Sequence, residues 1–63
     1  MIELNKITLA EIVQDNGGKI TETELNHRLI NMGASEHDAI SAINEFKGCR
    51  LVNFDGKTIS FKD

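Results

Sequence analysis

The residues that could carry catalytic or metal chemistry are few, and their spacing fits no arrangement for either. Cys49, His27 and His37 lack the paired spacing of a zinc site. No serine, histidine and aspartate are arranged for nucleophilic catalysis. Gly17-Gly18 precedes a lysine, but no phosphate-binding loop pattern follows. Because so small a domain also has little room for a substrate pocket, we expect no enzyme, no metal and no cofactor.

A row of polar side chains lies on one side of a predicted helix, and it is either a solvated surface or a site of contact with a partner. His37, Ser41 and Asn44 recur at intervals of four and three residues, which puts them on one side of a helix. Glu45 lies on the same side and Asp38 at its edge. These side chains can form hydrogen bonds with water or with a partner, and the elements around the helix are needed to choose between the two.

The chain has 63 residues and a net charge of -3, which predicts one small domain over residues 1–63. Its 40% hydrophobic content favours a folded chain. The first residues contain Glu3 and Glu11 and no long apolar run, so we expect neither a signal peptide nor a membrane span. Together with the lone Cys49, this pattern predicts a cytoplasmic protein without a disulfide.

Charge is unevenly distributed along the chain. Residues 1–46 hold three bases and eight acids, whereas residues 47–63 hold four bases and two acids. Nucleic-acid binders usually present a basic face, and only the C-terminal part could provide one. Lysines on exposed strands also deter aggregation, which is the alternative explanation for this group. Its members are Lys47, Arg50, Lys57 and Lys62.

Three helices are predicted from apolar spacing and capping signals. The first covers residues 5–15 and ends at the turn residues 15–18; Thr8 is its cap if it begins later. The second covers 22–32, with Thr21 as cap and Gly33 as its left-handed exit. The third runs from residue 36 to 46, begins at Ser35 and is ended by Gly48. The expected apolar sides are Leu9, Ile12 and Val13; Leu25, Leu29 and Met32; and Ala39, Ile40, Ala42, Ile43 and Phe46.

The C-terminal residues predict a β-hairpin around Asp55-Gly56, a strong two-residue turn signal. Counting outward pairs Phe54 with Lys57, Val52 with Ile59, and Arg50 with Phe61. One face then collects Val52, Phe54, Ile59 and Phe61, as in a sheet packed on one side. Residues 19–21 form either a bridge into the second helix or a brief strand.

This order of elements resembles the winged helix-turn-helix family. The resemblance covers nearly the whole chain and rests on "GGKIT" at 17–21, "MGAS" at 32–35, the "AI..I..F" spacing of 39–46 and "LVNFDGKTI" at 51–59. It implies an α+β domain of three helices followed by a C-terminal hairpin wing. Most such domains bind double-stranded DNA, with the third helix in the major groove and the wing on the backbone. Some bind proteins through the same surfaces.

Carried onto this chain, the resemblance implies base contacts from His37, Ser41 and Asn44. It implies phosphate contacts from Lys47, Arg50, Lys57 and Lys62, with neutral backbone contacts from Thr23 and Asn26. The chain departs from the family pattern because residues 36–46 hold three acids and no base. Two hypotheses therefore stand: a DNA-binding regulator, and a protein-interaction module that docks an acidic helix surface onto a basic or apolar partner.

Three apolar residues fit neither predicted helix face: Leu4, Ile7 and Ile30. Either the N-terminal segment folds over the core, or these side chains form a partner surface. Many winged-helix regulators are dimers, so the resemblance makes a homodimer one expectation for that surface.

Overall fold

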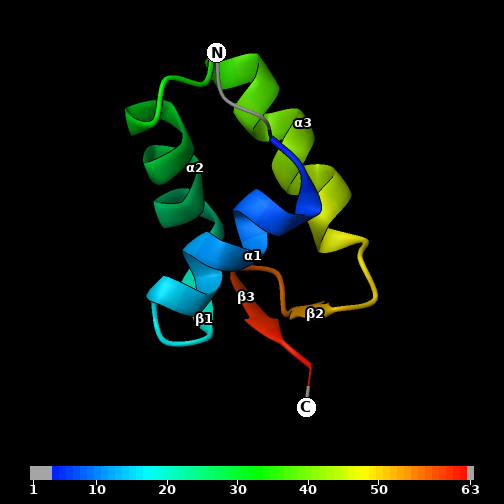
Figure 1. Ribbon diagram of the computed structural model, residues 1–63. Helices are drawn as coiled ribbons and strands as arrows, with labels where there is room; N and C mark the ends of the chain where they lie inside the picture. Colours follow the sequence, from blue (N-terminus) through cyan, green and yellow to red (C-terminus); the bar gives the residue numbers. More distant parts are fainter. Residues whose placement is uncertain (1–3, 63) are drawn as a thin grey trace.

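A computed structural model describes residues 4–62. Within this range the chain forms an α+β domain with three helices and a three-stranded antiparallel sheet. Helix α1 lies across helices α2 and α3, and the sheet lies at one end of the helices (Figure 1). The elements in chain order are α1 (Lys6–Asp15), β1 (Lys19–Thr21), α2 (Glu22–Asn31), α3 (Glu36–Lys47), β2 (Val52–Phe54) and β3 (Thr58–Phe61).

Each helix begins at a side chain that accepts a hydrogen bond from a backbone N–H in the first turn. The Thr21 hydroxyl oxygen accepts from the N–H of Glu24 at 3.2 Å, and that of Ser35 accepts from Asp38 at 3.1 Å. Both caps were predicted and are confirmed. In α1 the cap is Asn5, whose Oδ1 accepts from the N–H of Thr8 at 2.9 Å, so the helix does not begin at a Thr8 cap.

The core joins all three helices to the sheet. Two residues were wrongly predicted to face the core: Ile40 is 48% exposed and Met32 is 43% exposed. Ile40 lies about 100° around the helix from the stripe that faces the core, and Met32 follows the last residue of α2. The buried side chains are Leu9, Ile12, Val13, Ile20, Leu25, Leu29, Ala39, Ala42, Ile43, Phe46, Val52 and Ile59.

The predicted hairpin forms, but its register is displaced by two residues. Val52 lies opposite Phe61, and Phe54 lies opposite Ile59. The reason is the conformation at Asp55, whose Oδ1 accepts from the N–H groups of residues 57 and 58 at 2.9 and 2.7 Å. The type I′ turn that Asp-Gly favours needs positive φ at both central positions, and here only Gly56 has it, at 102°. Because the displacement is even, every side chain keeps its predicted face.

Residues 19–21 form a strand rather than a simple bridge. Strand β1 pairs antiparallel with β3, with Ile20 opposite Ile59, and gives the strand order β1-β3-β2. The N–H of Glu22 donates to the carbonyl of Lys57 at 2.9 Å. The start of α2 is therefore tied to the hairpin loop, which brings the hairpin close to the helix pair.

Candidate binding surface on helices α2 and α3

The three predicted polar side chains of α3 lie on one exposed ridge. His37, Ser41 and Asn44 are all exposed, and their spacing directs them away from the core stripe of the helix. The ridge separates two hollows. Asn44 lines a groove shared with α2, and Ser41 lines a shallower hollow shared with Leu4.

The groove between α2 and α3 has a volume of about 410 Å³. Ile43, buried, and Ile40, half exposed, give it apolar walls. Thr23 and Asn26 of α2 lie across from Asn44 and give it a polar rim. The Oδ1 atom of Asn26 is buried and has no hydrogen-bond donor among the described residues. A buried acceptor without a donor lowers the stability of a fold by about 1–3 kcal/mol. This wall of the groove therefore contains a hydrogen-bond acceptor that a donor from a partner could engage.

Lys47 closes one end of the groove. Its ammonium group forms an ion pair with the Glu22 carboxylate and lies 4.6 Å from the centre of the Phe54 ring. The Lys47 side chain is only 23% exposed. The residue predicted to contact phosphate therefore joins α3 to α2 and β2, and its charge is already matched within the chain.

The other base of the helix pair is also matched. Arg28 contacts the Glu24 carboxylate at 3.4 Å and donates from Nη2 to Oδ1 of Asn16 at 3.0 Å. Residues 22–47 contain five acids and two bases, and these contacts engage both bases. Among the described residues, three carboxylates of α3 have no basic partner: Glu36, Asp38 and Glu45.

The acids of α3 serve different purposes. Glu36 and Asp38 lie in its first turn, where a carboxylate interacts favourably with the helix dipole. Glu45 lies near the other end and lines the hollow that also contains Leu4, Asp38 and Ser41. One flank of the ridge is therefore acidic, and the other flank is the groove with apolar walls.

The remaining bases lie around the sheet. Lys19 lies opposite Ser60 in the β1–β3 pair, and because side chains alternate along a strand, Lys62 shares the face of Ser60. Arg50 and Lys57 lie in the segments before β2 and before β3. All four are exposed and form no ion pair within residues 4–62. Three predicted phosphate contacts, Arg50, Lys57 and Lys62, are thus exposed and without an ion pair in this range, whereas Lys47 is held by Glu22.

Leu4, Ile7 and Ile30 do not form one surface. Leu4 packs against the core, as expected if the N-terminal segment folds over it. Ile7 is 69% exposed on α1, and Ile30 on α2 is not part of the groove. Sequence reasoning missed Ile40 as a surface residue, although positions 39, 42, 43 and 46 alone complete a core-facing stripe.

No family model, curated protein or solved structure matches this chain. Within residues 4–62, no three histidine, cysteine, aspartate or glutamate side chains come together as metal ligands. None of the helices described is long and apolar enough to cross a membrane.

Proposed function

We propose that this domain is a protein-interaction module and that its docking surface is the α2–α3 groove together with the ridge of α3. The element order and the strand order β1-β3-β2 support a winged-helix arrangement, in which the third helix is the usual recognition element. The partner is a basic protein segment that carries an apolar side chain.

The observation that carries this proposal is the charge balance of the helix pair. Lys47 and Arg28 are held in ion pairs, so α3 presents carboxylates and no unmatched cation. DNA binding gains most of its affinity from bases that neutralise phosphates, and carboxylates at that position oppose it. A basic protein segment gains from the same charges.

The geometry also sets the spacing of the partner's side chains. An apolar side chain in the groove would contact Ile40 and Ile43, and a basic one would reach the Asp38–Glu45 flank on the opposite side of the ridge. The two positions are separated by about the 10 Å width of a helix. An extended segment covers that distance in about three residues, so we expect an apolar and a basic residue about three positions apart.

Double-stranded DNA is the second candidate, and one observation favours it. Lys19, Arg50, Lys57 and Lys62 lie in or beside the strands, are exposed and form no ion pair within residues 4–62, and they could contact phosphates while the ridge of α3 reaches base edges. In that case the affinity falls steeply with salt concentration, and Arg50→Ala and Lys57→Ala weaken binding to all sequences equally.

A selection from a random peptide library against the immobilised protein tests the proposal. We expect enriched peptides to combine an apolar residue with a lysine or arginine about three positions away. Their binding should be lost in Ile40→Asp and weakened in Glu45→Gln, and should persist in Met32→Asp, a control of similar exposure outside the groove. Peptides that bind Ile40→Asp as well as the wild type, or salt-sensitive DNA binding alone, would overturn it.

A further inference from the structure

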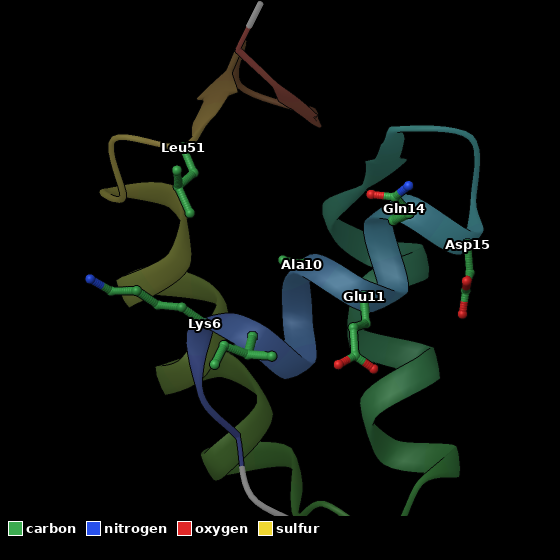
Figure 2. Close-up of a pocket in the computed structure, with 7 residues that line it drawn as sticks. Lys6, Ala10, Glu11, Gln14, Asp15 and Leu51 are labelled. Carbon is green, nitrogen blue, oxygen red and sulfur yellow. The ribbon is translucent and has the colours of Figure 1, made fainter.

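A second groove, of about 350 Å³, lies on the outer side of α1. Its apolar part is formed by Ile7, Ala10 and Leu51. Ile7 and Leu51 are 69% and 57% exposed, more than any other large apolar side chain in the described range. Figure 2 shows Leu51, from the segment before β2, extending toward α1 on the side of Lys6 and Ala10. This surface shares no residue with the α2–α3 groove.

The outer face of α1 follows a heptad pattern. Ile7, Ala10 and Gln14 occupy successive a, d and a positions, on the side of α1 opposite the buried Leu9, Ile12 and Val13. In parallel dimers a β-branched residue at a is combined with leucine at d, a position that Ala10 takes here, and a single polar residue at a fixes the register. The small Ala10 at d lets two helices approach closely. Ile7, Ala10 and Gln14 therefore form a short seam on which a second helix can pack.

The charges beside the seam of Ile7, Ala10 and Gln14 are complementary between two copies of the chain in one orientation. Lys6 occupies the g position before Ile7, and Glu11 occupies the following e position, five residues later. In a parallel pair, g of one helix lies beside that e of the other. In the parallel pair, two-fold symmetry repeats the contact between Lys6 and Glu11. In an antiparallel pair, the side of one helix that carries Glu11 and Asp15 faces the same side of the other helix, so like charges meet. In Figure 2 Lys6 and Glu11 extend in different directions from α1.

We propose that two copies of this chain pair through α1 in parallel, with the Ile7 and Gln14 side chains each facing their equivalents and reciprocal contacts between Lys6 and Glu11. Leu51 covers the seam from one side. The two-fold axis runs along α1, so the same patch is used on both copies. The pair is independent of the proposed partner binding.

The seam is small, which predicts a weak dimer. Stable interfaces bury about 800 Å² per partner, which is a large share of a chain with 4337 Å² of accessible surface. A helix of ten residues buries less than that, so we expect reversible dimers with a Kd on the order of 100 μM.

Sedimentation equilibrium over about 10 μM to 1 mM tests the pairing. We expect Ile7→Asp to abolish the dimer, and Lys6→Glu and Glu11→Lys each to weaken it about fivefold or more. The double variant should restore it, because the exchanged charges again face each other. Lys6→Glu also places an acid in the first turn of α1, where it favours the helix dipole. Its thermal unfolding temperature should not fall, which separates loss of pairing from loss of folding.

Disulfide trapping tests the orientation. In a Cys49→Ser background, Gln14→Cys should form a disulfide-linked dimer, because parallel symmetry brings the two positions together. Asp15→Cys, one residue away and off the seam, should not. A protein that stays monomeric throughout the concentration range, a double charge exchange that fails to restore the dimer, or equal trapping at positions 14 and 15 would overturn the proposal.

Discussion

The ammonium group of Lys47 pairs with the Glu22 carboxylate across the boundary between α3 and α2, although the two residues are 25 positions apart in the chain. The same ammonium group lies over the Phe54 ring of β2. One side chain thus joins both helices of the proposed docking surface to the sheet. The ion pair with Glu22 also neutralises the positive charge at the end of α3 where a phosphate contact was predicted.

Replacing Lys47 should therefore affect stability. We expect Lys47→Met to lower the free energy of unfolding by about 0.5–1.5 kcal/mol, since it removes a partly exposed ion pair and a cation–π contact. A double-mutant cycle with Glu22→Gln, measured by urea denaturation, should give a coupling energy of about 0.5–1 kcal/mol. Lys57→Met, exposed and without an ion-pair partner in the described range, is the control. Equal effects of the two lysine substitutions would contradict this role for Lys47.

Ile43 and Ile40 are matched probes of the core and the surface of α3, because they lie three residues apart and are 3% and 48% exposed. Ile43→Ala should cost about 2–5 kcal/mol, since it leaves a cavity among packed side chains. Ile40→Ala should cost well under half as much, as expected for a surface position. Chemical denaturation of both variants checks this. Similar losses would mean that Ile40 is buried in solution and not available to a partner.

The glycines after α2 and α3 should respond differently to alanine. Gly33 has a φ of 107°, whereas Gly48 has a φ of -86° and its nearest atom would lie 3.7 Å from an added Cβ. We expect Gly33→Ala to cost about 1–2 kcal/mol because of the left-handed backbone. Gly48→Ala should be neutral or stabilising by up to about 1 kcal/mol, because it restricts the unfolded chain. Thermal unfolding temperatures in the reverse order would contradict the described turn between α2 and α3.

Asp55 gives the hairpin a defined pH dependence. Hydrogen bonds from the backbone N–H groups of Thr58 and Lys57 hold the pKa of its carboxyl group below the ordinary value of 3.8. A carboxyl group whose pKa is lower in the folded state stabilises the fold above its unfolded pKa, and this contribution is lost as the pH falls through the folded value. Asp55→Asn keeps an oxygen acceptor but cannot titrate.

Acidification should therefore distinguish wild type from Asp55→Asn. Between neutral pH and about pH 2, the unfolding temperature of the wild type should fall further than that of the variant. An NMR titration should place the pKa of the Asp55 carboxyl group below the ordinary value of 3.8. An ordinary titration of Asp55 would mean that the loop does not hold these hydrogen bonds in solution.

Local signals in the sequence were sufficient for the helices, because caps and apolar spacing act within a few residues. Thr21, Ser35 and Gly33 are examples: each sets a helix end through its own backbone or side chain. The hairpin register was not predictable from Asp55-Gly56 alone, since it depends on how the Asp55 side chain folds back on the loop. Ile40 was missed as a surface residue although helix geometry already separates it from the stripe of Ala39, Ala42, Ile43 and Phe46. The groove itself was not predictable, because it depends on how α2 packs against α3. No local rule links Lys47 to Glu22.

The most direct test of the proposed docking surface is a chemical-shift map of a selected peptide on ¹⁵N-labelled protein. The α2–α3 groove predicts that the largest changes cluster at Thr23, Asn26, Ile40 and Asn44 and disappear in Ile40→Asp. Changes that cluster instead at Lys19, Arg50, Lys57 and Lys62, or that persist unchanged in Ile40→Asp, would contradict it.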